Sequence, residues 1–355
     1  MIDPKTIKKI EDQIQKGLPM VAYCLPDSSN LTVLLQNEEC DYDPTEFLEN
    51  AFHFYPFDTQ KRGFCIPNQQ ATLIQQKFNH KELPSEKNTI SINSEDKIWY
   101  QQLFDKTLAF LKNRKAEKIV ISRKVSFNIK EISFSTVLER LCHLYPQTFR
   151  YIWYHPETGL WCGATPELLM ESNEGYFKTM ALAGTKEANT NNKVAWTEKE
   201  RNEHQIVVDE ILYKLENILS VIKVSKTYTS TAGPLLHLRT DISGQLKKGK
   251  SSVSIVASNL HPTSAVCGMP TAVSKKFILE NENYNREFYT GYLGPIFGAN
   301  EPSFLFVNLR CMKLEKNKAH IFVGGGITKE SNAHDEWTET QNKMQPMLQV
   351  LQPFM

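Results

Sequence analysis

The sequence predicts an α+β fold that is built on largely antiparallel sheets. Apolar and β-branched runs occur in pairs joined by short turns: Arg150–Tyr154 is expected to pair with Leu160–Gly163, and Phe304–Lys313 with Lys318–Gly324. Stretches with helical periodicity are grouped between these hairpins, which favours the α+β class. The composition is that of a globular chain, because 41% of the 355 residues are hydrophobic and 23% are charged.

The N-terminal part of the chain offers short strands followed by a polar stretch. Met20–Cys24 and Leu31–Leu35 are compact apolar runs that indicate strands. The stretch from about Asn79 to Glu95 is polar and indicates a loop or linker. We therefore distinguish residues 1–94, a smaller N-terminal part, from residues 95–355, the main body, and expect both to belong to one structural domain.

The main body combines predicted helices with further strands. One helix is expected over Lys97–Asn113 and a longer one over Glu198–Val221. A last helix starts near Asp335, and Pro346 should kink or end it soon afterwards. Besides the two hairpins, we expect strands at Ile119–Ser122 and Phe177–Leu182.

The balance of charges argues against polyanionic partners. Lys and Arg number 41 and Asp and Glu 40, so the formal net charge is +1. We therefore expect no nucleic-acid partner. We expect no membrane partner either, because no run approaches the ~18 apolar residues that a membrane span needs. The seven cysteines are scattered without a C-x-x-C pair, and the polar N-terminus does not resemble a signal peptide, which together predict reduced thiols and a cytoplasmic protein.

The helix expected after residue 197 carries a carboxylate at the start of its apolar face. Thr197 and Glu200 have the spacing of a capping box, which marks the first turn. Apolar side chains then recur every three or four residues, at Val207, Ile211, Leu215, Ile218 and Ile222. Counting back four residues from Val207 gives Glu203. A carboxylate that faces a core needs a charged partner or a metal ion, whereas acids in the first turn of a helix are also commonly solvated. The spacing alone does not decide whether Glu203 is a buried ligand or a solvated side chain.

The last predicted helix brings Glu336, Glu339 and Lys343 to one face, because they are three and four residues apart. On its own this pattern also suits an ordinary ion pair on the surface. Val323–Ile327, just before the helix, contains three consecutive glycines that would let a backbone pass close to a ligand. Two glutamates from different helices, completed by substrate and water oxygens, would suit Mg²⁺. We therefore hypothesise, from the sequence, a magnesium site that joins the two helices.

Ten short motifs stand in the order of a known family. From about Lys97 to Leu351, the chain resembles the chorismate-binding family, which includes isochorismate, salicylate, anthranilate and aminodeoxychorismate synthases. The motifs are Lys118–Arg123, Gly163–Leu169, Leu182–Thr185, Asn202–His204, Leu236–Leu238, His261–Pro270, Tyr289–Gly291, Asn308–Arg310, Gly324–Ile327 and Glu336–Lys343. A single motif of this kind is weak, whereas ten in order are specific.

The resemblance implies a fold and a ligand set. The fold would have two similar α/β halves with large antiparallel sheets and outer helices, and the site would lie in a deep cleft between the halves. The substrate would be chorismate, and Mg²⁺ would be held by Glu203 and Glu339, with Glu336 beside it. Neither an obligatory protein partner nor an assembly beyond the monomer is expected. Substrate contacts are implied for Gly184, Thr185, His237, Ala265, Tyr289, Arg310, Gly325, Gly326 and Lys343.

Two further residues decide which reaction is expected. Lys118 resembles the lysine that activates water in the hydroxylating members, and Glu167 resembles the general acid that protonates the departing 4-hydroxyl. A lysine acts as a base only when it is neutral, which requires burial or nearby positive charge. The expected activity is therefore that of isochorismate synthase, a Mg²⁺-dependent isomerase that adds water at C2 of chorismate and releases the 4-hydroxyl. Its product would feed menaquinone or siderophore synthesis.

Three other functions remain open at this point. A salicylate synthase would also eliminate pyruvate, although the pair Ala265–Val266 resembles isochorismate synthases instead. An anthranilate or aminodeoxychorismate synthase would need ammonia or an amidotransferase. Lys118 speaks against this branch, and Ala183 speaks against aminodeoxychorismate synthase in particular. A chorismate-binding protein without activity would not need both Lys118 and Glu167.

Overall fold

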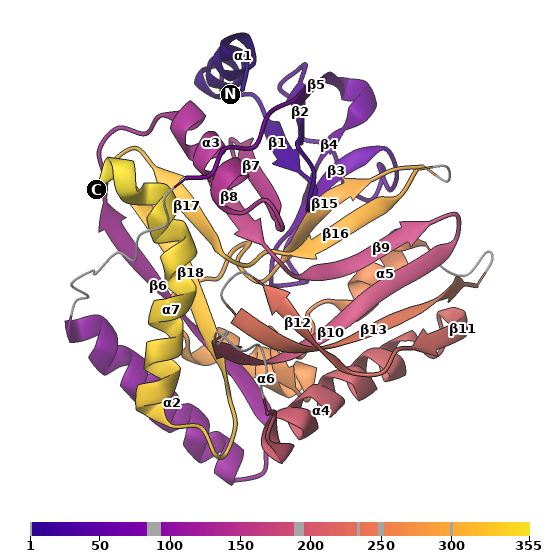
Figure 1. Ribbon diagram of the computed structural model, residues 1–355, viewed down its shortest axis with the longest axis vertical. Coiled ribbons are helices and arrows are strands. Elements are labelled where there is room, and N and C mark those ends of the chain that lie inside the picture. The colour runs from indigo at the N-terminus through magenta and orange to yellow at the C-terminus, as the bar shows by residue number, and fades with distance from the viewer. Residues whose placement is uncertain (1, 84–93, 188–194, 233–234, 248–251, 299–300) are drawn as a thin grey trace.

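Two antiparallel sheets of nine strands each form the centre of the molecule (Figure 1), which confirms the α+β prediction. The computed structural model describes residues 2–83, 94–187, 195–232, 235–247, 252–298 and 301–355. Sheet A contains, in spatial order, β14 (Gly268–Met269), β6 (Lys118–Asn128), β18 (Lys318–Ile327), β17 (Cys311–Glu315), β8 (Gly159–Thr165), β7 (Phe149–His155), β1 (Met20–Cys24), β2 (Asn30–Gln36) and β5 (Ala71–Lys77). Sheet B contains β11 (Leu219–Val224), β13 (Leu235–Leu246), β10 (Tyr176–Glu187), β9 (Leu168–Asn173), β16 (Ser303–Val307), β15 (Tyr292–Ile296), β3 (Ala51–Tyr55) and β4 (Phe64–Pro67), and β12 (Tyr228–Ala232) pairs with β13.

Helices cover the outer faces of both sheets (Figure 1). Sheet A carries α1 (Pro4–Gln15), α2 (Ser94–Lys112), α3 (Phe134–Leu144), α6 (Thr271–Asn281) and α7 (Ala333–Leu351). Sheet B carries α4 (Glu198–Leu215) and α5 (Val253–Leu260). Two short 3-10 turns, η1 (Asn68–Gln70) and η2 (Gln352–Phe354), complete the elements. None of the helices in the described ranges is long and apolar enough to cross a membrane.

The inner faces of the two sheets meet in an aromatic layer. Side chains alternate along each strand, so one set faces the helices and the other faces the opposite sheet. Phe149 of β7 stacks on Phe306 of β16 with ring centroids 4.4 Å apart, and Trp153 of β7 lies 5.2 Å from Phe54 of β3. This layer joins sheet A to sheet B beneath the cleft described below, and it gives the two halves a fixed relative position.

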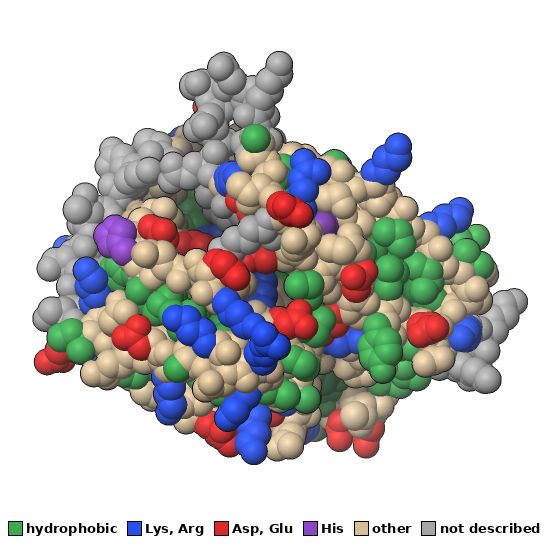
Figure 2. Space-filling view, turned by 90° about the horizontal axis from the view of Figure 1, so that it is seen from below, with side chains coloured by type: hydrophobic (Ala, Val, Ile, Leu, Met, Phe, Trp, Pro, Cys, Tyr) green, Lys and Arg blue, Asp and Glu red, His purple; other side chains and the backbone are tan. Residues whose placement is uncertain are grey.

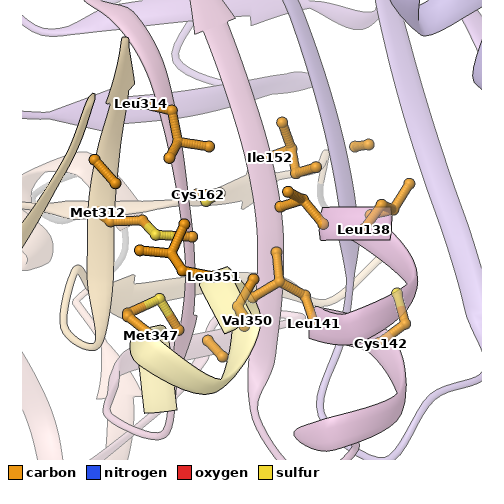
Figure 3. Packing of buried hydrophobic residues seen from close by; sticks show 14 of the residues in the cluster. Leu138, Leu141, Cys142, Ile152, Cys162, Met312, Leu314, Met347, Val350 and Leu351 are labelled. Carbon is orange, nitrogen blue, oxygen red and sulfur yellow. The ribbon is translucent and has the colours of Figure 1, made fainter. Parts of the chain in front are cut away.

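The C-terminal half of α7 is anchored in the outer core of sheet A. Figure 3 shows Met347, Val350 and Leu351 of α7 packed with Leu138 and Leu141 of α3 over the sheet. The helix continues through Pro346 to Leu351, so of the two expected effects of the proline, a kink or an early end, the early end does not occur. The burial of these last apolar side chains outweighs the hydrogen bond that the proline removes.

The predicted helix over Glu198–Val221 is too long, because α4 ends at Leu215 and Leu219–Val224 forms the edge strand β11. The helical part of the apolar stripe is buried as expected, at Val207, Ile211 and Leu215. The remaining residues pair with β13 instead, where Ile222 faces Gly244. Tertiary pairing here overrides a periodicity that fits a longer helix.

The run Phe304–Lys313, expected to be one strand, is divided between the two sheets. β16 ends at Val307 in sheet B and β17 begins at Cys311 in sheet A. The chain crosses between them at Asn308–Arg310, where Arg310 adopts a positive φ of 47°. Only β17 then forms the predicted hairpin with β18.

A second crossover lies beside this one. β8 of sheet A leads into β9 of sheet B through Pro166 and Glu167. The two crossovers are hydrogen-bonded to each other, because the Val307 N–H donates to the Glu167 carbonyl at 2.9 Å and the Ala164 N–H to the Arg310 carbonyl at 3.0 Å. Glu167 and Arg310 are therefore fixed at one place, where the chain twice changes sheet.

Residues 2–83 contribute strands to both sheets. β1 lies between β2 and β7 in sheet A, and β3 pairs with β15 in sheet B. Most of the polar stretch from Asn79 to Glu95 lies outside the described residues. All seven cysteines are free thiols, as expected. On the face shown in Figure 2, basic and acidic side chains are interspersed, in keeping with the net charge of +1.

Candidate active site

A cleft of about 470 Å³ is lined by residues of both sheets and of helices α4 and α7. Thirteen of the fourteen residues expected from the sequence line it, and the side chain of the fourteenth, Thr185, lies outside the described residues. The thirteen are Lys118, Glu167, Gly184, Glu203, His237, Ala265, Tyr289, Arg310, Gly325, Gly326, Glu336, Glu339 and Lys343.

Lys118 is the first residue of β6, and its side chain crosses the backbone of the neighbouring strand β18. A Cβ atom at Gly326 would lie 2.5 Å from the Cε and 3.2 Å from the Nζ of Lys118. The Lys118 backbone is held by the Ser274 hydroxyl, which donates to the Lys118 carbonyl at 3.1 Å. The absence of a side chain at Gly326 therefore decides where the lysine stem can lie.

The other two glycines of β18 make room in the same way. A Cβ atom at Gly325 would lie 2.9 Å from the Oε2 of Glu336, and one at Gly324 would lie 3.1 Å from the Oη of Tyr289. The sequence suggested that this glycine run lets a backbone approach a ligand. The structure shows that each glycine accommodates a different side chain of the cleft.

Helix α7 turns its charged face to the cleft instead of to solvent. The Lys343 Nζ lies 2.5 Å from the Oε1 of Glu339 and donates to the Gly324 carbonyl at 3.0 Å. The Lys343 ammonium holds the pKa of Glu339 below its usual range, so this carboxylate is ionised at neutral pH. Glu336 is oriented by Ser331, whose hydroxyl donates to its Oε1 at 2.7 Å.

Arg310 and Tyr289 come from irregular segments that are tightly held. The Arg310 Nη1 donates to the Lys343 carbonyl at 2.9 Å, in the turn of α7 that precedes Pro346. Tyr289 is buried and stacks on Phe322 with ring centroids 5.5 Å apart. Burial raises the pKa of Tyr289, so the phenol stays protonated and can donate a hydrogen bond.

The wall from sheet B presents Gly184 and His237. The His237 Nδ1 donates to the Gly184 carbonyl at 2.9 Å, and this bond assigns the proton of the neutral ring to Nδ1. Burial lowers the pKa of His237, so the neutral ring prevails at pH 7 and its Nε2 is an acceptor. Gly184 has a positive φ of 70°, which glycine adopts without strain.

Glu203 reaches the cleft from the first turns of α4. The predicted capping box is present, because the Thr197 N–H donates to the Glu200 carboxylate at 2.7 Å and the Glu200 N–H to the Thr197 hydroxyl at 3.4 Å. The next residue, His204, is buried with its Nε2 at 2.7 Å from the Thr240 hydroxyl of β13. This contact anchors the helix to sheet B beside Glu203.

The loop that carries Ala265 is positioned by a buried ion pair that the sequence analysis missed. Glu210 of α4 accepts from the Ser264 N–H at 3.0 Å and pairs with Lys214 at 3.0 Å. Lys214 also donates to the Pro262 carbonyl at 3.0 Å. The i, i+4 spacing of Glu210 and Lys214 is visible in the sequence, but it does not reveal that the pair is buried beneath a loop.

A second buried ion pair behind the cleft was also missed. Glu282 and Arg286 form two contacts, of 2.5 and 2.8 Å, and both side chains are only 2% exposed. Arg286 donates to the carbonyls of Val120 and Val266, at 2.7 and 3.0 Å. Both valines line the cleft, so the pair ties β6 to the loop that carries Ala265.

Burial shifts Lys118 and Glu167 toward their neutral forms. Burial raises the pKa of Glu167 to about 7, against the opposing charges of Lys118, Lys343 and Arg310. Glu167 also lines a small, mainly apolar cavity. Burial lowers the pKa of Lys118, and Lys343 adds to this effect, whereas the nearby carboxylates oppose it. A lysine that can lose its proton and a carboxyl that can keep one thus share the cleft.

The carboxylates of the cleft suit a cation that needs few protein ligands. Glu203, Glu336 and Glu339 line one space from two helices, and hard oxygen ligands of this kind are those that Mg²⁺ prefers. In the described ranges, no three His, Cys, Asp or Glu side chains surround one point as a complete ligand set. A cation that uses one or two protein carboxylates, with waters and substrate oxygens as its other ligands, would fit this arrangement.

Comparison with known proteins places these features in one family. A family model described as chorismate binding enzyme matches residues 56–352. Isochorismate synthase EntC of Escherichia coli K12 is 28% identical over 261 residues, which cover 71% of this chain and just under two thirds (66%) of EntC. The vibriobactin-specific isochorismate synthase of Vibrio cholerae is 27% identical over 348 residues, or 94% of this chain and 85% of that protein. The solved structure of the menaquinone-specific isochorismate synthase MenF of E. coli superposes with a TM-score of 0.79 at 21% identity, covering 94% of this chain and 88% of MenF, and so shares the fold.

Proposed function

The chain belongs to the chorismate-binding enzyme family, and from this premise we propose that it is an isochorismate synthase, an isomerase that converts chorismate to isochorismate with Mg²⁺. One observation carries the choice of reaction. Lys118 and Glu167 line the same cleft, and burial shifts the pKa of each toward the neutral form that a base and an acid require.

The cleft can bind a dianionic ring although the chain is almost neutral overall. Arg310, Lys343 and the Tyr289 phenol would hold the two carboxylates of chorismate, with Arg310 suited to a bidentate grip. His237, Ala265 and the backbone at Gly184, Thr185, Gly325 and Gly326 would contact the ring and its substituents. The cationic groups gathered in the cleft would attract the substrate even though the protein has almost no net charge.

Glu203 and Glu339 would hold Mg²⁺, with Glu336 beside them. When bound, the cation supplies positive charge next to the ring carboxylate, where charge accumulates during the reaction. Glu339 is already ionised beside Lys343, so it needs no proton loss before it binds a cation.

The proposed chemistry uses one base and one acid. Neutral Lys118 takes a proton from a water molecule, whose oxygen forms a bond to C2 of chorismate. The ring double bonds shift, and the C4–O bond breaks while Glu167 gives its proton to the departing hydroxyl. One water enters and one leaves, so the product is an isomer of the substrate and keeps its pyruvyl ether.

The product would feed menaquinone or siderophore synthesis. The similar proteins include a menaquinone-specific and a vibriobactin-specific isochorismate synthase. Among the rival activities, elimination of pyruvate to form salicylate and amination of the ring differ in their products. A product analysis therefore separates all three.

Purified protein incubated with chorismate and Mg²⁺, without ammonia, should yield a product of unchanged mass that separates from chorismate by chromatography. EDTA and the substitution Glu203→Gln should each abolish this product, because EDTA removes the cation and the substitution removes one of its carboxylate ligands. Salicylate with an equal amount of pyruvate would assign the chain to salicylate synthases. Chorismate that is consumed only after ammonia is added would assign it to the aminating branch.

A further inference from the structure

Helix α2 contributes one buried hydroxyl that the proposed chemistry does not use. Tyr100 is only 1% exposed, and its ring packs against Trp337 of α7 with centroids 5.5 Å apart. It belongs to an apolar cluster with Leu103, Phe104 and Ile327. For packing alone, a phenylalanine would fill this position as well.

The Tyr100 Oη is buried and has no hydrogen-bond partner in the described part of the chain. A buried hydroxyl that makes no hydrogen bond destabilises a protein relative to an apolar group of the same shape. Such a group needs an explanation, and one explanation is a partner that is present only when a ligand is bound.

The surroundings of the hydroxyl indicate what that partner is. A Cβ atom at Gly325 would lie 4.0 Å from the Tyr100 Oη and 2.9 Å from the Glu336 Oε2, so both oxygens border the bare Cα of one glycine. The other carboxylate oxygen of Glu336 is engaged by Ser331. Burial raises the pKa of Tyr100, and the charges of Glu336 and Glu339 add to this, so the phenol is a donor at neutral pH.

We propose that Tyr100 is a positioning residue for Glu336: when Mg²⁺ occupies the cleft, the Tyr100 hydroxyl donates a hydrogen bond to the Glu336 carboxylate, directly or through one water. Ser331 and Tyr100 then hold the carboxylate from two sides and fix the oxygen that faces the cation. Hydrogen bonds to carboxylates around a cation orient them and strengthen binding. The inference rests on the proposed function, because it assumes a cation between α4 and α7.

The test compares Tyr100→Phe with wild type by calorimetric titration with MgCl₂ and by thermal unfolding with and without MgCl₂. Without Mg²⁺, the variant should unfold at the same temperature as wild type or at a higher one, because it loses a hydroxyl without a partner. With Mg²⁺, its Kd should rise about tenfold, as is usual when such a hydrogen bond is lost. A structural role alone would lower stability without changing the Kd.

Two further variants make the test specific. Tyr23→Phe removes another buried hydroxyl, in the aromatic layer and away from the cleft, and should leave the Kd for Mg²⁺ unchanged. The double variant Tyr100→Phe, Glu336→Ala should bind Mg²⁺ no more weakly than Glu336→Ala alone, because alanine offers the Tyr100 hydroxyl no acceptor and the hydrogen bond needs both partners.

The outcomes separate this inference from the proposed function. Equal Kd values for wild type and Tyr100→Phe, or additive losses in the double variant, would overturn the role of Tyr100 while leaving the isomerase intact. A wild-type protein that binds no Mg²⁺ even in the presence of chorismate would overturn both.

Discussion

Lys118 and Glu167 share one cleft but lie in opposite electrostatic surroundings. The charges nearest to Lys118 include the carboxylates of Glu203, Glu339 and Glu167, which favour its charged form. The charges nearest to Glu167 are cations, which favour its charged form as well. Burial nevertheless moves both groups toward neutrality, so removal from water outweighs the attraction of opposite charges at both positions. Under the proposed function, these charged neighbours would bind the cation and the anionic ring.

The two residues also differ in how the backbone holds them. Lys118 begins a regular strand, and its stem lies over Gly326 of the paired strand. Glu167 lies in a crossover between sheets, where its carbonyl accepts from the Val307 N–H. The proposed base is thus positioned by steric fit against a sheet, and the proposed acid by hydrogen bonds between the two crossovers.

Removal of the proposed base should have the largest effect. Lys118→Ala is expected to lower kcat by about 10³-fold, because general base catalysis contributes on the order of 10²–10⁴. Lys118→Arg should be no better, since a guanidinium does not give up its proton at pH 7. The exposed Lys115, three residues earlier, provides the control, and Lys115→Ala should retain full activity. A Lys118→Ala enzyme with a tenth of wild-type kcat would show that another group activates the water.

Alanine substitutions at two neighbouring glycines should affect the proposed base and the proposed cation site independently of each other. Gly326→Ala places a Cβ against the Lys118 stem and should lower kcat about 10²-fold, since a displacement of ~1 Å can cost that much. Gly325→Ala places it against Glu336 and should mainly raise the Mg²⁺ concentration needed for half-maximal rate. Steady-state kinetics over a range of MgCl₂ concentrations distinguish the two effects. The same defect in both variants would argue for a general distortion of β18.

The pH dependence should show the smallest but most diagnostic effect. Glu167 is active as an acid when protonated, so kcat/KM should fall as pH rises through about 7, by at most tenfold per pH unit. Lys118 is active when neutral, so the rate should fall on the acidic side as it becomes protonated. Glu167→Gln should lower kcat/KM and abolish the limb near pH 7, as measured over a series of buffers of equal ionic strength. If that limb persists in the variant, another group is responsible for it.

Much of the fold could be predicted where local pattern and tertiary pairing agree. The strand Met20–Cys24 was predicted with its correct bounds, because a fully buried run of this length has few alternatives. The capping box at Thr197 fixed the start of α4. The end of α4 could not be predicted, since Ile218 and Ile222 continue the helical spacing and only the pairing with β13 turns this segment into a strand. The division of Phe304–Lys313 likewise depends on two sheets that the sequence does not show.

Residue chemistry alone predicted less of the site than local patterns predicted of the fold. Spacing placed Glu336 and Glu339 on one face, and magnesium chemistry suggested a link to the helix of Glu203, but only the family motifs made that link specific. Tyr100 lies in no such motif. The role proposed for it depends on the burial of its hydroxyl beside Gly325, which only the packed structure shows. The neutralising burial of Lys118 and Glu167 is also a property of the assembled cleft, which no local pattern encodes.

The pairing of β6 with β18 has a consequence for how the protein comes to be active. Lys118 and Gly326 are neighbours across the two strands, although roughly 200 residues of chain separate them, and the entropy of closing such a loop must be lost before the contact forms. A partly folded molecule can therefore contain most of its helices and hairpins and still have no cleft. During refolding, activity should therefore return only after these distant strands have paired. It should return later than the spectroscopic signal of secondary structure.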